Sequence, residues 1–414
     1  MRGGAARPAG GERAPPPEPA WRALFRERDF RNLWVVGLAV FVVRWLETLA
    51  VGIFAYAATG SAFVVAMLTM LRLLPMGLFG AFLGAVAERS DRRRALLMMV
   101  LSQMATSAVL ALLAATETIA VWHLALASFM NGLAWASDNP VRRAMIGQVA
   151  GPARMGVAMS LDVATSNGSR VLGPVLGGTL LAAIGLDGAF LLSVVIYLPA
   201  LLATLRLNRP PPAPPGPAAP VLARIAEGLA FVRREPRLIG ALMVTLLFNL
   251  FGWPFTSMIP VIGKDSLGLG PQGVGVLASL DGIGAFSGAV AAAVLARPAQ
   301  YGAIYVGGIT LYFAGVVGFA LAPGPVAAGV ALLLAGLGGA GFAVMQPTLV
   351  FLATPAEMRS RVLGLLSVCI GLGPLGFLLL GGLAEAVGAS AATAGMGIAG
   401  LVALLLTRRW WRRM

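Results

Sequence analysis

Long apolar runs separated by short charged segments make up most of this chain of 414 residues. A helix of about 20 predominantly apolar residues crosses a lipid bilayer, whereas a soluble domain carries about 25% charged residues. This chain carries 12% charged residues. We therefore predict an all-α integral membrane protein with twelve transmembrane helices, near 34–57, 62–87, 95–115, 119–141, 157–183, 187–205, 238–262, 270–296, 301–321, 324–352, 362–384 and 389–407.

The basic residues fix the expected orientation of these helices. Of 30 arginines, three lie inside apolar runs, and the other 27 lie in the two terminal tails and in every second segment between runs. Lys264 is the one basic residue of the remaining segments. Because Arg and Lys mark the cytoplasmic side, we expect a multi-pass protein of the bacterial inner membrane with both termini in the cytoplasm. Clustering of arginines between spans, without a basic face that carries aromatics, argues against nucleic acid as a partner.

A long segment over 206–237 divides the spans into two groups of six. It begins with a proline-rich stretch, which cannot cross the membrane as a helix. The stretch "VLARIAEGLAFVRREPRL" follows, and its apolar spacing favours an amphipathic helix on the membrane surface over a plain linker. We expect a disordered cytoplasmic tail over 1–30, six-helix bundles over 31–205 and 238–407, and a short cytoplasmic tail over 408–414.

Two short repeats relate the groups. Leu-Gly-Pro occurs at 172–174 and at 372–374, and "PARM" at 152–155 corresponds to "PAEM" at 355–358. Their similar offsets predict two pseudo-symmetric bundles, a transporter architecture with a site at the interface of the repeats.

Enzyme chemistry and cofactors are not expected. The chain has one cysteine, Cys369, and one histidine, His123, so a multi-Cys or multi-His metal site is excluded. No phosphate-binding motif G-x-x-x-x-G-K-[ST] occurs. We expect neither a metal nor a cofactor.

The densest charge lies in "GAVAERSDRRRALL", between the second and third runs. It resembles the loop signature of the major facilitator superfamily, Gly-x-x-x-Asp-Arg-x-Gly-Arg-Arg, at Gly84, Glu88, Arg89, Asp91, Arg92 and Arg93. The resemblance covers residues 30–408 and implies that the loop belongs to an inner gate.

We expect the two acids of this loop, Glu88 and Asp91, to lie near Arg359 and Arg361 or near the positive N-terminus of that helix. Replacing Glu88 by Gln is expected to lower transport without affecting membrane insertion.

The fifth run contains "SNGSRVLGPVLGG". It resembles the antiporter signature of the same superfamily at Gly173, Pro174, Gly177 and Gly178, which implies export. Small residues allow helices to approach closely. The wider sequence over the fourth and fifth runs resembles the enterobactin-exporter and macrolide-efflux branch.

Ionisable residues inside a membrane are costly and usually face a cavity or a partner. The candidates for transport and proton coupling are Arg44, Glu47, Asp162, Arg170 and Asp281. Arg44 and Glu47 share a helix face, as a closed ion pair or as a cavity pair whose glutamate titrates. Glu47 or an anionic substrate group is the expected partner of Arg170. Asp281 either carries a proton or packs against the fifth span.

Other polar and aromatic residues have simpler expectations. Arg72 is expected to pair with Glu47, and Asp138 with Arg142 at the surface. Asn249 and Gln346 are expected to bond neighbouring helices. Four aromatics are candidates for an apolar cavity wall or for ordinary packing: Phe248, Trp253, Phe255 and Tyr312.

The sequence therefore favours a monomeric secondary transporter that exports a small amphipathic molecule (a drug, macrolide or siderophore) in exchange for protons. Uptake of an organic anion through Arg44 and Arg170 is one alternative. A lipid-handling or non-transporting membrane protein is the other.

Overall fold

A computed structural model describes residues 20–89, 91–208, 221–355 and 358–412. Within these ranges, the side chains of residues 20, 80–89, 139–140, 152, 221–225, 293, 359–360 and 363–364 are not described. The described chain is helical, and its elements are α1 (Ala20–Arg26), α2 (Arg28–Thr59), α3 (Ala62–Arg89), α4 (Arg92–Ala115), α5 (Val121–Leu205), α6 (Val221–Val232), α7 (Pro236–Leu247), η1 (Phe248–Gly252), η2 (Trp253–Met258), α8 (Ile259–Asp265), α9 (Pro271–Leu295), η3 (Pro298–Gln300), α10 (Tyr301–Ala320), α11 (Pro325–Leu352), α12 (Arg359–Gly371), α13 (Gly373–Val387), α14 (Ala389–Leu406) and α15 (Arg408–Trp411).

The 85 residues of α5 are three helices in succession. Gly151 and Gly185 leave the helical conformation, with φ of +67° and +75°. Glycine adopts a positive φ without steric cost, so these two positions allow the chain to turn between crossings. The second and third sections of α5 are therefore the fifth and sixth spans.

In the described residues, ten stretches are long and apolar enough to cross a membrane. One of them, Ala153–Leu205, contains the turn at Gly185 and supplies two crossings. The first section of α5, which ends at the Gly151 turn, supplies one more. The predicted all-helical fold with twelve crossings is thus confirmed.

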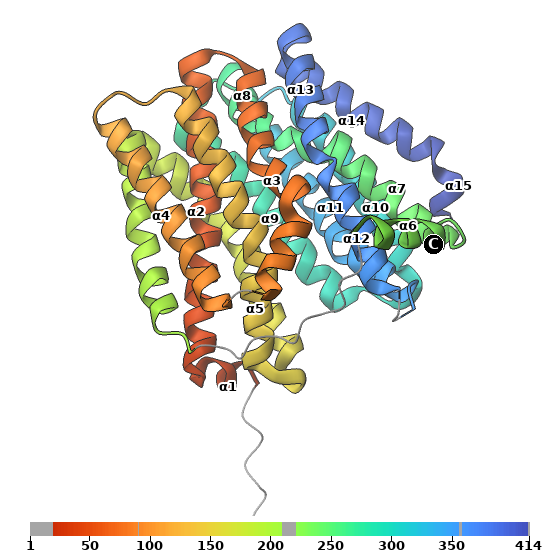
Figure 1. Cartoon of the computed structure of the whole chain (residues 1–414). Coiled ribbons are helices and arrows are strands. Elements are labelled where there is room, and N and C mark those ends of the chain that lie inside the picture. The colour runs from red at the N-terminus through yellow and green to blue at the C-terminus, as the bar shows by residue number, and fades with distance from the viewer. Residues whose placement is uncertain (1–19, 90, 209–220, 356–357, 413–414) are drawn as a thin grey trace, which may run out of the picture.

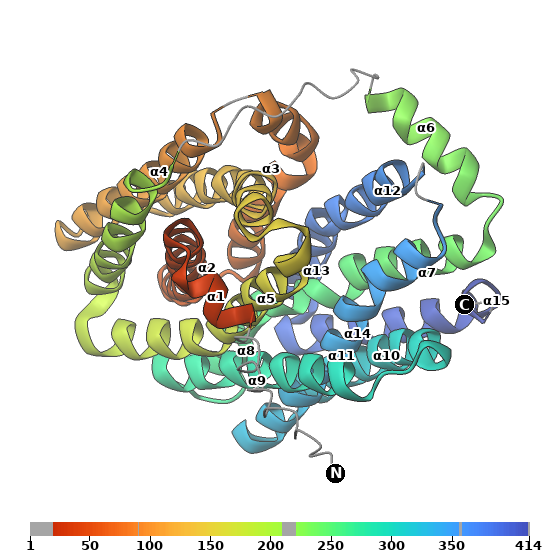
Figure 2. The same ribbon diagram turned by 90° about the horizontal axis from the view of Figure 1, so that it is seen from below.

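The crossings form two bundles with a boundary between them (Figures 1 and 2). In one bundle, α5 packs against α2, α3 and α4, and in the other α11 packs between α9 and α10. The most extensive contacts between the bundles are those of α5 with α9 and of α3 with α13. A central site between repeats therefore has α5 and α9 on one of its sides.

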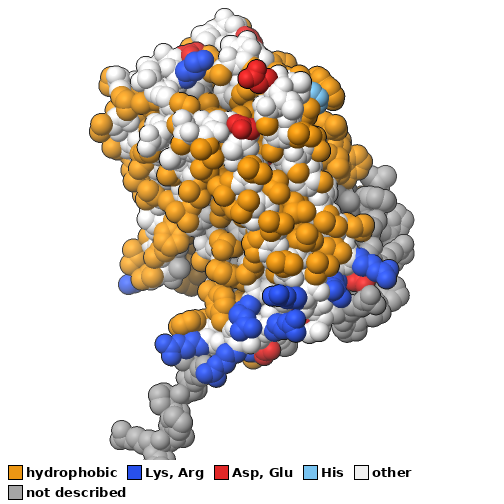
Figure 3. All heavy atoms as spheres, turned by 90° about the vertical axis from the view of Figure 1, so that its left-hand side faces the viewer, with side chains coloured by type: hydrophobic (Ala, Val, Ile, Leu, Met, Phe, Trp, Pro, Cys, Tyr) orange, Lys and Arg blue, Asp and Glu red, His pale blue; other side chains and the backbone are white. Residues whose placement is uncertain are grey.

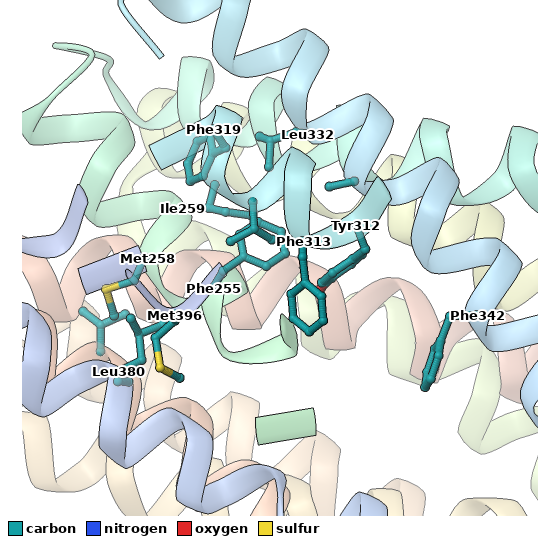
Figure 4. Packing of buried hydrophobic residues seen from close by; sticks show 14 of the residues in the cluster. Phe255, Met258, Ile259, Tyr312, Phe313, Phe319, Leu332, Phe342, Leu380 and Met396 are labelled. Carbon is teal, nitrogen blue, oxygen red and sulfur yellow. The ribbon is translucent and has the colours of Figure 1, made fainter. Parts of the chain in front are cut away.

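Aromatic side chains fill the second bundle. Phe255, Tyr312, Phe313 and Phe319 lie within one apolar cluster, close to Ile259 and Leu332 (Figure 4). Edge-on contacts join Phe255 to Tyr312 and to Phe319, with ring centroids 5.6 and 6.1 Å apart. Packing of this kind holds η2, α8, α10 and α11 together.

The outer surface matches a membrane. Large apolar side chains are exposed along the helices, among them Leu112 at 65%, Leu406 at 77% and Val326 at 83%. Figure 3 shows apolar side chains over the middle of one face and Lys and Arg side chains gathered toward its lower end. We call the end with α1, the start of α4 and the Gly151 turn the Arg-rich end.

Three segments outside the membrane spans can be compared with the sequence expectations. Within the tail expected to be disordered over 1–30, α1 is helical and α2 begins at Arg28, because Leu24 and Phe30 are buried against the first bundle. The expected amphipathic helix after the proline-rich stretch is present as α6, which packs against α12. The C-terminal tail contains the short helix α15.

A central cavity with buried charges

A cavity of about 410 Å³ lies between the bundles. Its walls come from α2, α3, α5 and α8–α13 and from the irregular turns η1 and η2. Pro254 and Pro260 lack a backbone N–H, and the chain between Phe248 and Met258 is accordingly π-helical and 3₁₀-helical. Irregular backbone of this kind is tolerated at membrane depth where it lines a cavity.

One ion pair crosses the boundary between the bundles inside this cavity. Arg170 of α5 donates a hydrogen bond to the Asp281 carboxylate of α9, and their side chains are 24% and 5% exposed. The guanidinium also lies over the Trp45 ring, 5.5 Å from its centroid. The prediction that Glu47 is the partner of Arg170 was wrong, because α9 brings Asp281 to the same depth in the membrane as Arg170. For Asp281, packing against the fifth span is confirmed.

The backbones of α5 and α9 approach closely around this pair. The Ser279 hydroxyl donates to the Val171 carbonyl over 2.7 Å. A Cβ atom at Gly282 would lie 2.6 Å from the Arg170 carbonyl oxygen. The ion pair is therefore built into a tight contact between bundles.

The antiporter-like motif forms the continuation of that contact. A Cβ at Gly173 would lie 2.4 Å from Cβ of Trp45, and one at Gly177 would lie 2.8 Å from the Leu46 carbonyl oxygen. These glycines seat α5 on α2.

Gly178 faces the other way, toward the second bundle, where a Cβ would lie 2.4 Å from the Pro271 carbonyl oxygen. Pro174 lines the cavity, and its carbonyl oxygen lies 2.6 Å from the position of a Cβ at Gly275. The close helix approach expected from this motif is confirmed.

Arg44 lies on the cavity wall without the expected pairing to Glu47. Its guanidinium lies over the rings of Trp135 and Phe41, with centroid distances of 4.4 and 5.3 Å. Its Nη2 atom is buried and has no hydrogen-bond partner. The closed Arg44–Glu47 pair was wrong because the two side chains leave α2 toward different neighbours.

Glu47 points into the first bundle. It accepts hydrogen bonds from the Ser107 hydroxyl at 2.6 Å and from the Asn131 amide at 3.2 Å, and it is 2% exposed. Arg72 interacts with it electrostatically but donates its hydrogen bond to the Thr48 hydroxyl at 2.7 Å. The direct Arg72–Glu47 pair was therefore wrong.

Asp162 belongs to a buried network nearer the Arg-rich end. Arg142 donates to both oxygens of Asp138, at 2.8 and 3.0 Å, and also to Asp162. Arg143 donates to the second oxygen of Asp162 at 3.0 Å. The Asp138–Arg142 pair is confirmed, but its surface location was wrong, since neither side chain is more than 1% exposed.

The loop motif has a simpler role in the part that the structure describes. Asp91 is the N-cap of α4 and accepts from the backbone N–H groups of Arg93 and Arg94. Arg361, one of its expected gate partners, pairs with Glu227 of α6 at 2.6 Å. The side chains of Gly84, Glu88, Arg89 and Arg359 lie outside the described residues, and Arg92 follows the cap on the first turn of α4.

Aromatic residues complete the site. Phe248, Trp253 and Tyr312 line the cavity as one expectation had it, whereas Phe255 is in the core. Sequence reasoning missed Trp45, Trp135, Phe342 and Phe377, which also line it. Apolar spacing in a membrane helix does not separate a cavity face from a packing face, so no pattern marked these four.

Hydrogen bonds close the end opposite the Arg-rich end. Tyr56 of α2 donates to Asp265 of α8, and Ser61 donates to Glu385 of α13. The Phe63 backbone N–H donates to the same glutamate at 3.3 Å. Each bond joins the two bundles, so this end is held shut beyond the cavity.

Comparison with known proteins places this architecture. Residues 20–412 match the family described as transmembrane secretion effector. The multidrug efflux pump Tap of Mycolicibacterium fortuitum is 28% identical over 379 residues, 84% of this chain and 88% of Tap. The staphyloferrin A transporter of Staphylococcus aureus (strain NCTC 8325 / PS 47) is 22% identical over 66% of this chain and 67% of that protein. The match to the uncharacterized MFS-type transporter YfiS of Bacillus subtilis (strain 168), 29% identical, spans 48% of each chain, about half the length of that relative.

Solved structures share the fold. A mutant of the nucleoside transporter NupG superposes with a TM-score of 0.74 at 14% identity, over 92% of this chain and 99% of NupG. A bacterial homologue of the human lysosomal transporter Spinster, inward-facing and unoccupied, gives 0.67 at 16% identity, over 95% and 96%. The chain belongs to the transmembrane secretion effector family of the major facilitator superfamily: it is a multi-pass secondary transporter of a small molecule, not an enzyme.

Proposed function

We propose that this protein exports small amphipathic molecules across the bacterial inner membrane by alternating access, in exchange for protons. The observation that carries the proposal is the Arg170–Asp281 pair, which lies on the cavity wall and joins the two bundles. A proton that arrives at Asp281 removes its charge and weakens the bond that holds α9 to α5. Substrate occupancy and proton occupancy thus act on one contact.

Asp281 is favoured as the proton carrier over the other two acids. It lines the cavity, and its Oδ1 atom is buried without a hydrogen-bond partner. Glu47 and Asp162, in contrast, have their carboxylates engaged within the first bundle. Neither of these two acids is among the residues that line the cavity, which suits a structural role more than a role in the transport cycle. Arg170 is then the residue that binds Asp281 in one state and releases it in another.

Export is favoured over uptake by the motif at Gly173–Gly178 and by the relatives named as efflux pumps. The Arg distribution supports cytoplasmic termini, with the Arg-rich end on the inside and the closed Tyr56–Asp265 end on the outside. Both bundles and the cavity belong to one chain, so a monomer suffices for the cycle.

Everted membrane vesicles test this proposal. Vesicles that contain the protein are energised with a proton gradient, and accumulation of a panel of drugs and siderophores is measured with and without an uncoupler. We expect uncoupler-sensitive accumulation of at least one amphipathic compound in wild-type vesicles and none with Asp281→Asn. Accumulation only in right-side-out vesicles would instead support uptake of an organic anion.

A further inference from the structure

The two walls of the central cavity differ in chemistry. Four charged residues line it, and all three cations come from the first bundle: Arg44, Arg72 and Arg170. The second bundle contributes one acid, Asp281, and the larger aromatic surface, which consists of Phe248, Trp253, Tyr312, Phe342 and Phe377. The wall residues therefore leave an excess of positive charge on one side and an apolar surface on the other.

Two of the cations already have an acid in their surroundings. Arg170 is paired with Asp281, and Arg72 interacts electrostatically with Glu47. Among the described residues Arg44 has no comparable partner. The acid that acts on it electrostatically, Asp138, is bonded through both oxygens to Arg142.

Arg44 and Arg72 are connected through one residue. The Thr48 hydroxyl, one helical turn from Arg44, donates to the Arg44 carbonyl at 2.6 Å and accepts from Nη1 of Arg72 at 2.7 Å. Nη2 of Arg44 and Nε of Arg72 are buried N–H donors without partners. Nε of Arg170 is also buried without a partner. Buried polar groups are nearly always hydrogen-bonded, so the unpaired donors of Arg44 and Arg72, which Thr48 connects, indicate a missing acceptor.

We propose that Arg44 and Arg72 form an anion subsite, and that the transported molecule is an amphipathic organic anion, such as an aromatic carboxylate. Its oxyanion accepts from Arg44 and Arg72, and its ring lies on Trp135 and the aromatic wall of the second bundle. The inference rests on the proposed function and names the substrate class that the cavity takes. An arginine and a carboxylate match in charge and in donor geometry, and burial strengthens the bond.

A charge series measures this preference directly. The probes are biphenyl-4-carboxylate, biphenyl-4-carboxamide and biphenyl-4-methylammonium, which share one body and carry charges of −1, 0 and +1. Binding to the purified full-length wild-type protein in detergent is followed by its thermal stabilisation. We expect the carboxylate to bind at least about tenfold more tightly than the amide. This ratio corresponds to the free energy of one hydrogen bond to a charged group.

Arginine variants assign the preference to the subsite. Arg44→Gln is expected to remove the carboxylate preference, and Arg44→Lys is expected to retain part of it. Arg154 pairs with Glu27 outside the cavity, so Arg154→Gln is the control and is expected to leave the preference unchanged. The wild-type series stands even where a variant does not fold. Equal or tighter binding of the amide or the ammonium probe overturns the inference, as does a preference that survives Arg44→Gln.

The outcome is separable from that of the proposed function. If the ammonium probe is exported by wild-type protein and not by Asp281→Asn, proton-coupled export holds and the anion subsite is wrong. If the carboxylate binds through Arg44 but no vesicle accumulates any probe in response to a proton gradient, the subsite holds and the export mechanism is wrong.

Discussion

Arg170 and Asp281 are ion-paired across the boundary between the two bundles, on the same pair of helices that meet at Gly178 and Gly275. The charged contact lies on the cavity wall, and the glycine contact lies beyond it, toward the closed end. Separation of α5 from α9 at either contact strains the other. In the proposed mechanism, protonation of Asp281 weakens the charged contact and so favours the opening of the cavity.

Enlarging Gly178 should hold the closed end apart. We expect Gly178→Val to abolish transport, since its Cβ would lie 2.4 Å from the Pro271 carbonyl oxygen, a backbone atom that cannot yield. Labelling of a cysteine introduced at Thr256, on the cavity wall, by a membrane-impermeant maleimide added outside cells should increase in a Cys369→Ser background. A Cβ at Gly168 on the same helix would meet nothing within 4 Å, so Gly168→Val serves as the control. Equal labelling of the two variants contradicts the role of Gly178.

Removing the Tyr56 hydroxyl should weaken the same closure by less. Tyr56→Phe loses the hydrogen bond to Asp265, and a bond to a charged group contributes about 1.5–3 kcal/mol. We expect the open population at this end to rise by about tenfold or more, read as the maleimide labelling rate at Thr256. Tyr301→Phe, at the start of α10 and away from the closed end, is the matched control. An unchanged rate in Tyr56→Phe argues that the closure does not depend on this bond.

The fold could be predicted from the sequence because each membrane-spanning helix is marked by the hydropathy of its own residues. Each apolar run is long enough to cross a membrane alone, and the Gly173–Gly178 motif specifies close approach through residue size alone. Helix boundaries near the tail shifted because Leu24 and Phe30 are buried by tertiary contacts that no local pattern contains.

The partners of the buried charged residues were harder to predict from the sequence. Spacing along α2 placed Arg44 and Glu47 on one face. In the structure, however, Ser107 of α4 and Asn131 of α5 donate hydrogen bonds to Glu47. The Arg170–Asp281 pair joins positions 111 residues apart. Which charges meet depends on how two bundles dock, and that is a property of the whole structure.

Asp162 should be a stability residue rather than a proton carrier. Asp162→Asn leaves Arg143 without this carboxylate and leaves the buried Arg142 with the carboxylate of Asp138 alone, and breaking a buried ion pair costs about 3–5 kcal/mol. We expect a clearly lower melting temperature in detergent and an unchanged proton-to-substrate ratio in reconstituted protein. Glu27→Gln removes an exposed pair with Arg154 and should change stability by about 0–1 kcal/mol. A stable Asp162→Asn protein with altered coupling would refute the structural role.

Glu47→Gln should behave in the same way, for a different reason. The amide keeps the shape of the carboxylate, but it removes the charge that faces Arg72 and replaces one acceptor with a donor. We expect a loss of about 1–3 kcal/mol in stability with proton coupling intact, measured by thermal melting and by reconstituted flux. Loss of proton coupling in a well-folded Glu47→Gln protein would move the carrier role to Glu47.

The most direct test of proton-coupled export is the flux of Asp281→Asn in proteoliposomes, with net transport and substrate exchange measured side by side. An amide at position 281 cannot exchange a proton, but it leaves the cavity lined by the same helices. We predict that transport driven by a pH gradient is lost while exchange of labelled for unlabelled substrate continues. Wild-type response to the pH gradient in Asp281→Asn, with normal net flux, would contradict the account.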